Sequence, residues 1–308
     1  MPQLFIRKTI FIEKSVVEVF KLINDFHHWP KWSPWLIADP KVKIKVDPDG
    51  KYYNWESPIL GSGEMSIEHE QENQSINCDL QFFKPWRSKA KVTFYLNAKN
   101  SGTEVVWTMR SSLPFYLSWM KKQMHVFIGM DYERGLNLLK DLAENGKNMC
   151  NLNFEGIITY EATHYYGFKR KSSYSNFKIE MAHDFKERAP YMTEHYKELV
   201  NGPPFSIFHK FNVVKGRVNY TIGFPIKYPI ASSNQRYFVG SLPKMRVHSI
   251  EHLGPYRHLS NAWAAQMMYQ RSKQFRPLKK IAPFEIYLNN PSDTPEKALK
   301  TKVMFPVR

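Results

Sequence analysis

The second half of the chain contains the same short pattern twice. The segment Pro204-Phe205-Ser206-Ile207-Phe208 returns 79 residues later as Pro283-Phe284-Glu285-Ile286-Tyr287, and Phe224-Pro225-Ile226 returns 81 residues later as Phe305-Pro306-Val307. Two matches in the same order, with nearly equal offsets, indicate a duplicated unit of strand, helix, strand and strand. We expect two related α/β halves about a pseudo-two-fold axis, with a cleft where they meet.

Local patterns complete this duplicated unit. A strand-like stretch over 157–170 precedes a helical pattern with Phe177, Met181 and Phe185 four residues apart, and Pro190 is expected to break that helix. In the second copy, a strand over 245–252 is followed by a helix whose apolar face is Leu259, Ala262, Trp263 and Met267.

The first half has the pattern of an α+β domain. Residues 4–13 alternate between two faces as a strand does. Ser15 and Glu18 form a capping box before a short helix with apolar positions Val16, Val19, Phe20 and Ile23. Further strands are expected at 41–46, 51–56, 63–69, 74–84, 87–97 and 103–111, before a long helix at 124–144.

Composition excludes several protein classes. With 43% hydrophobic and 23% charged residues among 308, the chain is neither disordered nor fibrous. It has no run of about 18 apolar residues, and its first twenty residues lack the pattern of a signal peptide. Only two cysteines, Cys78 and Cys150, are present, which excludes a disulfide framework. We expect a cytoplasmic protein of two domains.

Positive charge is concentrated in the second half. Residues 1–150 contain 20 Lys and Arg against 17 Asp and Glu, whereas residues 151–308 contain 24 against 11, within a net charge of +16. A basic half of this kind could contact nucleic acid or an anionic membrane. The basic residues are scattered and no DNA-binding motif accompanies them, so no direct nucleic-acid partner and no membrane insertion are expected.

A polar stretch rich in Gly and Asn separates the two halves. On this composition we predict an N-terminal domain over 1–146, a linker over 147–156 and a C-terminal domain over 157–308.

The first domain resembles the START-like superfamily, in its polyketide-cyclase branch. The resemblance lies in the opening strand, the capped helix with Val19-Phe20, and the segment Trp29-Pro30-Lys31-Trp32-Ser33-Pro34-Trp35. It implies a helix-grip fold, in which an antiparallel sheet wraps a long C-terminal helix around an apolar cavity for a small ligand. Aromatic side chains could line that cavity or simply fill the core: Trp55, Phe82, Phe83, Trp86, Phe94, Tyr95, Trp107, Phe115, Tyr116 and Trp119.

The second domain resembles the GyrI-like family, also called the AraC-type effector-binding domain. The residues that carry the resemblance are 252–256 (His-Leu-Gly-Pro-Tyr), 283–291 and 305–307, with 202–208 matching the first half of the family pattern. The resemblance implies two pseudo-symmetric α/β halves and a cleft for small organic molecules, often cationic or amphipathic. Some members of the family belong to transcription regulators, and others have been linked to hydrolysis of reactive compounds.

Glu285 is the leading candidate for a functional residue. In a strand, Glu285 and Tyr287 point to one face while Phe284 and Ile286 point to the other. We expect the apolar pair to face the helices and Glu285 to face the cleft, where the family's glutamate maps. The aromatic residues expected nearest to it are Tyr256, Trp263 and Tyr287, and the repeat presents Ser206 and Phe208 across the axis.

Three functions fit a glutamate in an aromatic cleft. It could bind an organic cation in a sensor, carrier or sequestering protein, because a carboxylate attracts the charge and aromatic rings add cation–π contact. Glu285 could instead act as a general base in a hydrolase, with Tyr256 or Tyr287 as proton donor. A ligand-responsive transcription regulator acting through a partner is the third hypothesis.

Other chemistries are not indicated by the sequence. His27 and His28 could act in acid–base catalysis, but they lie in a loop without a paired carboxylate motif, which favours a surface role. His248 and His252 lie in an expected strand, where their spacing does not form a chelate. Neither a metal nor an organic cofactor is expected.

Overall fold

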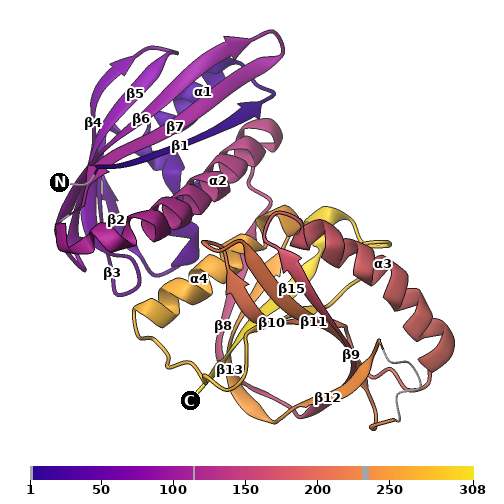
Figure 1. Ribbon diagram of the computed structural model, residues 1–308. Coiled ribbons are helices and arrows are strands. Elements are labelled where there is room, and N and C mark those ends of the chain that lie inside the picture. The colour runs from indigo at the N-terminus through magenta and orange to yellow at the C-terminus, as the bar shows by residue number, and fades with distance from the viewer. Residues whose placement is uncertain (1–2, 114, 231–235) are drawn as a thin grey trace. The chain divides into compact units, whose positions relative to one another are not determined.

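The computed structural model of the protein, drawn in Figure 1, describes residues 3–113, 115–230 and 236–308. The chain divides into two compact units. The first comprises residues 1–150 and 263–274, and the second comprises residues 151–262 and 275–308. Both units are mixed α+β, and each is built on one large antiparallel sheet.

The first unit is a seven-stranded sheet with a long helix. Its strand order is β1-β7-β6-β5-β4-β3-β2, and α1 (Val16–Ile23) separates the first two strands in the chain. The strands are β1 (Gln3–Ile12), β2 (Lys43–Val46), β3 (Tyr52–Ser57), β4 (Gly61–Gln71), β5 (Ser75–Lys84), β6 (Ser88–Lys99) and β7 (Gly102–Ser112). A 3-10 helix, η3 (Phe115–Met120), leads into α2 (Lys121–Asn145), which runs along the sheet (Figure 1).

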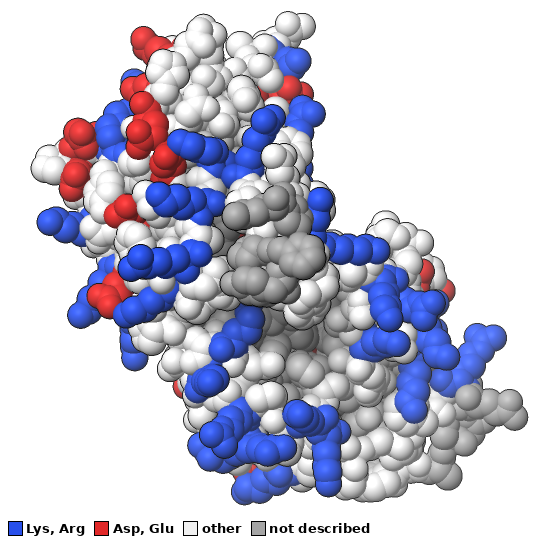
Figure 2. All heavy atoms as spheres, turned by 60° about the vertical axis from the view of Figure 1, so that its left-hand side comes forward, with Lys and Arg blue, Asp and Glu red and all other residues white. Residues whose placement is uncertain are grey.

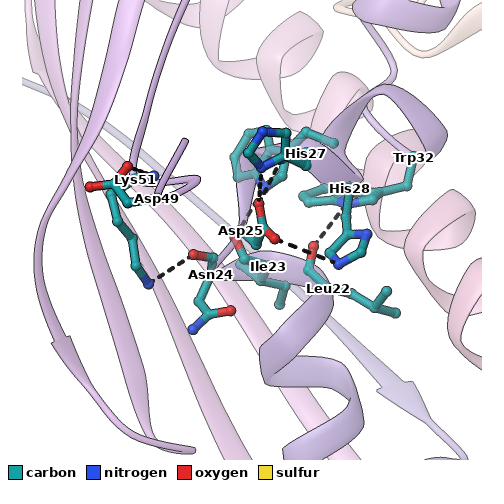
Figure 3. A network of polar contacts seen from close by, with 10 residues as sticks. Leu22, Ile23, Asn24, Asp25, His27, His28, Trp32, Asp49 and Lys51 are labelled. Atoms are coloured by element: carbon teal, nitrogen blue, oxygen red, sulfur yellow. Dashed lines mark hydrogen bonds and ion pairs between the residues drawn. The ribbon is translucent and has the colours of Figure 1, made fainter. Parts of the chain in front are cut away.

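Helix α1 begins and ends at identifiable side chains. The predicted capping box is present, since Ser15 and Glu18 exchange hydrogen bonds at its start. At its end, the carbonyl oxygens of residues 22, 23 and 24 accept hydrogen bonds from Trp32 Nε1 at 3.2 Å, Trp29 Nε1 at 2.9 Å and Lys51 Nζ at 3.0 Å (Figure 3). The aromatic segment after α1 therefore satisfies carbonyl groups that a helix end leaves unpaired.

Aromatic rings fill the interior between the sheet and α2. Trp107 of β7 stacks on Tyr132 of α2, with ring centroids 3.9 Å apart, and on Phe94 of β6 at 4.8 Å. Trp29 and Trp32 contact the same Trp107 ring edge-on. All five side chains are buried, so this part of the interior is packed by the protein's own residues.

The sheet of the second unit carries the duplication. Its strand order is β12-β9-β11-β10-β14-β15-β13-β8, which is symmetric about the β10–β14 pair. The strands are β8 (Asn151–Tyr160), β9 (Thr163–Ser173), β10 (Phe205–Asn212), β11 (Arg217–Ile226), β12 (Phe238–Leu242), β13 (Met245–Leu253), β14 (Phe284–Tyr287) and β15 (Lys300–Val307); the helices are α3 (Phe177–Tyr196) and α4 (Ser260–Arg271). Each copy thus contains the predicted strand, helix, strand and strand.

The duplicated unit is one strand longer than the sequence pattern suggested. The stretch over 157–170 belongs to two strands, β8 and β9, and β8 begins at Asn151, inside the stretch predicted as a linker. β8 pairs with β13 of the second copy, and β12 pairs with β9 of the first. Each copy therefore contributes its first strand to the sheet of the other copy.

Pro190 does not break α3, and the prediction of a break there was wrong. The helix continues from Phe177 to Tyr196 with Pro190 inside it. Proline removes one backbone donor, and an exposed helix tolerates this because water can solvate the freed carbonyl group. Pro190 is exposed, as this explanation requires.

The two faces of the second sheet differ from the predicted assignment. Phe284 and Ile286 lie in an apolar cluster with other strand residues, which are Tyr165, Phe205, Ile207, Leu242, Met245, Val247 and Met304. Tyr287 instead contacts Met181 and Phe185 of α3. The Glu285 face is therefore the helix-covered face, because the apolar face is covered by the sheet's own strands.

The composition predicted that the chain has no disulfide framework and no membrane-spanning helix. Cys78 and Cys150 are both buried, and no disulfide joins them. No helix among the described residues is both long and apolar enough to span a membrane.

Candidate functional site

Glu285 lies at the centre of the second unit. It pairs with Ser206 across the β10–β14 junction, so the two equivalent positions of the repeat face each other. The Glu285 residue is 5% exposed and Ser206 is fully buried. A buried carboxylic acid is uncommon in a folded protein unless it is hydrogen-bonded or used.

Tyrosine and α3 side chains surround the carboxyl group. The Tyr287 hydroxyl donates a hydrogen bond to Glu285 Oε2 at 2.6 Å and lies 3.5 Å from Met181 Sδ. The Tyr287 ring meets Phe185 edge-on at 5.0 Å and Tyr256 at 6.1 Å between centroids. Tyr256 and Tyr287 are both partly exposed, so the aromatic wall beside Glu285 reaches solvent.

Both tyrosines are held in the protonated form. Burial, reinforced by the negative charge of Glu285, raises the pKa of Tyr287 well above its ordinary value. The same two causes raise the pKa of Tyr256 to about 12. Tyr287 is therefore a hydrogen-bond donor to Glu285 at neutral pH, and it supports negative charge on that carboxyl group.

A polar row extends from Tyr287 across two further strands. Thr301 of β15 pairs with Tyr287 on one side and with His252 of β13 on the other, which places the three side chains on one face. His252 and Thr301 are fully buried. Among the described residues, neither ring nitrogen of His252 nor the Thr301 hydroxyl has a hydrogen-bond partner.

This row predicts a loss of stability in acid. Burial, with a smaller contribution from His258, lowers the pKa of His252 to about 4, compared with about 6.5 in an unfolded chain. Between these values the unfolded state binds a proton that the folded state does not, so stability falls as pH falls. The protonation of His252 should lower the free energy of unfolding by about 3 kcal/mol once the pH is below 4.

Unfolding free energies measured across this pH range, for the wild type and His252→Asn, check this prediction. The wild type should lose more stability on acidification than the variant does. Equal slopes for the two proteins would show that His252 does not titrate as its burial implies.

The remaining predicted site residues lie in different surroundings. Phe208 is buried and contacts Phe211 and Tyr220. Trp263 lies on α4, in the segment that groups with the first unit. The structure thus brings together Glu285, Tyr287 and Tyr256 around the β10–β14 junction, with Ser206 directly opposite Glu285.

Sequence reasoning missed the contribution of α3 to this site. Met181 lies 3.9 Å from Ser206 Oγ as well as beside Tyr287, and Phe185 packs on the Tyr287 ring. Their four-residue spacing was interpreted only as a helix face. The pseudo-two-fold symmetry of the repeat was the available signal, because it brings both copies, each with its helix, to the junction.

Asp184, on the same helix, anchors a charged network. It is fully buried and accepts hydrogen bonds from Arg170 Nε at 2.6 Å and the Tyr220 hydroxyl at 3.1 Å, with Arg188 at 3.6 Å. Potential ligand atoms of Asp184, His183 and Glu187 lie within 4.8 Å of one another. A metal ion there would meet two guanidinium groups, so these residues fit an ion-pair network better than a metal site.

His27 and His28 have a structural role in the first unit. Asp25 accepts hydrogen bonds from the His27 backbone and from His27 Nδ1, both at 2.8 Å, and lies 3.9 Å from His28 Nε2 (Figure 3). Burial raises the pKa of Asp25, but the His27 hydrogen bonds and the charges of His27 and His28 outweigh it and leave the pKa lowered. Asp25 thus caps the 3-10 helix η1 (Phe26–Lys31).

Gly50 belongs to the same network. Its φ is +71°, and a Cβ atom at this position would lie 2.3 Å from Asp25 Oδ1. Only glycine combines this backbone conformation with so close an approach.

The first unit has a hollow that the sequence did not indicate. It measures about 610 Å³ and lies over four neighbouring strands, lined by residues 3–5, 79–81, 89–91 and 110–112. Ten aromatic residues were predicted as a cavity lining, and none of the eight whose side chains are described takes part in it. Trp55, Phe94 and Trp107 are core residues, and Phe82 is partly buried. Phe83, Trp86, Tyr95 and Trp119 are exposed, and the side chains of Phe115 and Tyr116 lie outside the described part.

Comparison with known proteins identifies the second unit. A family model described as a GyrI-like small molecule binding domain matches residues 156–308. No curated protein matches the chain.

Several solved structures have similar folds. The EcmrR C-terminal domain is 13% identical, with a TM-score of 0.41, over 52% of this chain and 98% of its own. SAV2435, solved with tetraphenylphosphonium, is 16% identical with a TM-score of 0.38, over 51% and 94%. Aha1 from Colwellia psychrerythraea is 18% identical with a TM-score of 0.36, over 47% and 99%.

These structural similarities are weak, and the identification depends on the family match. Residues 156–308 of this chain form a GyrI-like small-molecule-binding domain.

Proposed function

We propose that the second unit binds an organic cation in a cleft centred on Glu285. The observation that carries this proposal is a buried carboxyl group in contact with a partly exposed aromatic wall. A carboxylate attracts the positive charge, and the faces of Tyr256 and Tyr287 add cation–π attraction and apolar contact. The protein would act as a sensor, carrier or sequestering protein for such a compound.

The geometry favours binding over hydrolysis. Glu285 Oε2 already accepts the Tyr287 hydroxyl hydrogen, which competes with a water that would need activation. The raised pKa values of Tyr256 and Tyr287 make both hydroxyls weak proton donors to a leaving group. The hydrolase with Glu285 as general base is therefore the second candidate, and catalytic turnover lost in Glu285→Gln would support it.

Glu285→Gln should weaken binding of an amphipathic cation by roughly ten- to a hundredfold, because a desolvated charge pair is lost. Titration of tetraphenylphosphonium, a cation without hydrogen-bonding groups, measures this effect. The variant keeps an acceptor oxygen for the Tyr287 hydroxyl, so the fold should be retained. Glu251→Gln, on β13 of the same unit, is the matched control and should bind as the wild type does. Equal affinity of Glu285→Gln and the wild type would contradict the assignment.

For the first unit, we propose a START-like helix-grip domain that occupies residues 1–146. A sheet of seven antiparallel strands with α1 after the first strand and a long C-terminal helix supports this proposal. The link to the GyrI-like domain would be shorter than the predicted stretch over 147–156, because β8 already begins at Asn151. An apolar ligand in the first unit would have to lie away from the ring stack of Trp107, Tyr132 and Phe94, which is already packed.

A further inference from the structure

Exposed aromatic side chains gather at one end of the first sheet. Of the eight tryptophans in the chain, Trp86 and Trp119 are the two in the exposed class, at 52% and 74% of their surface, and Phe83 is 43% exposed. Burying large aromatic rings is strongly favourable, so rings left in water at one place mark a surface used for contact.

Strand pairing places these residues at the same end. Phe83 lies next to the last residue of β5, and Trp86 lies in the connection between β5 and β6. The start of β6 pairs with the end of β7, as Ala90 pairs with Ser111, and η3 with Trp119 follows two residues after β7. The β5–β6 connection and η3 therefore extend from adjacent strand ends.

The same two segments are basic. Residues 83–87 read Phe-Lys-Pro-Trp-Arg, and residues 118–122 read Ser-Trp-Met-Lys-Lys. They contain four basic residues and no acidic one, and all four basic side chains are exposed: Lys84, Arg87, Lys121 and Lys122. Glu56 lies 3.9 Å from Lys84, in a highly exposed pair that contributes little.

We propose that this end of the first unit, defined by Phe83, Trp86, Trp119 and the four basic residues, docks on the surface of an anionic lipid bilayer. Tryptophan and phenylalanine rings partition into the interfacial region of a bilayer, where an apolar ring and a polar edge are both accommodated. Lysine and arginine beside them are attracted to anionic headgroups. A protein partner would also use the rings, but the uniform positive charge favours a surface that is uniformly negative.

Among its described residues, the second unit has positive charge without a cluster of exposed aromatic rings. The second unit is more basic overall, with 24 Lys and Arg against 11 Asp and Glu over residues 151–308, and Figure 2 shows many Lys and Arg side chains spread over the face that it draws. Its most exposed apolar residues among those described are Ile179 and Tyr228, at 75% and 62%. Ile179 lies on α3, whereas Tyr228 follows β11. If charge alone decided membrane binding, the second unit would bind the membrane. Positive charge together with clustered aromatic rings is found in the first unit, so we expect the first unit to bind.

Co-sedimentation of the full chain with vesicles tests the proposal. The protein should pellet with mixed phosphatidylcholine–phosphatidylserine vesicles and much less with phosphatidylcholine alone. The double variant Trp86→Ala, Trp119→Ala should bind the mixed vesicles roughly tenfold more weakly or worse. Each of Lys84→Glu and Lys121→Glu should lower binding by roughly fivefold or more. All of these side chains are exposed, so the variants should fold.

Matched variants of the second unit are the controls. Ile179→Ala with Tyr228→Ala removes exposed apolar surface, and Lys178→Glu with Lys186→Glu removes exposed positive charge, without touching the first unit. Both should bind vesicles nearly as the wild type does.

Three results would overturn the proposal. The first is absence of binding to the mixed vesicles. The second is binding that depends on Lys178 and Lys186 but not on Trp86 and Trp119, which would indicate nonspecific attraction through the second unit. The third is a dimer in sedimentation velocity that dissociates in the double tryptophan variant, with no vesicle binding, which would assign the rings to a second copy of the chain.

Discussion

Asp184→Ala is expected to destabilise the second unit by about 3–5 kcal/mol, because removing one partner of a buried charge network leaves the other charges uncompensated. Asp184 is fully buried and contacts Arg170, Arg188 and Tyr220 from three different elements. The Asp184 hydrogen bond is the main cause that raises the pKa of Arg170. Loss of this carboxylate would therefore release α3 from β9 and β11.

Chemical denaturation of the intact chain measures this effect, as a shift of the transition that belongs to the second unit. Glu187→Ala is the matched control, since Glu187 lies on the same helix, is exposed, and pairs with His183 at 3.5 Å. That control should change stability by less than about 0.5 kcal/mol. Equal effects of the two substitutions would show that the Asp184 network is not the anchor of α3.

Trp107→Ala should destabilise the first unit by about 3–5 kcal/mol, as truncation of a buried large aromatic residue does. Trp107 is 1% exposed and touches rings from β6, α2 and the segment after α1. The backbone of α2 packs directly against the Trp107 ring at Gly135, where a Cβ atom would lie 2.7 Å from the ring. Removal of the ring would leave a large cavity between sheet and helix.

The comparison variant is Trp86→Ala, which removes the same side chain from an exposed position. Unfolding monitored by near-ultraviolet circular dichroism should show a large loss of stability of the first unit for Trp107→Ala and almost no loss for Trp86→Ala. A Trp107→Ala variant as stable as the wild type would contradict the prediction. It would show that the rings around Trp107 are not tightly packed.

Local patterns predicted most of the elements. Ser15 and Glu18 predicted the start of α1, because a capping box depends only on two residues three positions apart. The strands of the first sheet alternate between buried and exposed residues, and their predicted and observed bounds differ by a few residues. The repeat around Ser206 and Glu285 predicted a junction that strand pairing places at the centre of the second sheet.

The errors came from features that depend on distant parts of the chain. Alternation showed that Glu285 and Phe284 face opposite ways, but it could not show that strands rather than helices cover Phe284. β8 and β12 pair with the opposite copy, and a local pattern contains no information about such an exchange. The segment with Trp29 and Trp32 indicated a family resemblance, but its sequence could not show that their indole N–H groups cap α1 from outside the helix.

Two ions of nearly the same size and shape but opposite charge test whether this basic protein binds a cation beside Glu285. Binding of tetraphenylphosphonium and tetraphenylborate to the wild type should be measured by calorimetry at the same ionic strength. With a net charge of +16, nonspecific attraction favours the anion. We expect the cation to bind more tightly, at one site per chain, and Glu285→Gln to remove this preference. Tighter binding of the anion to the wild type would contradict cation binding at Glu285.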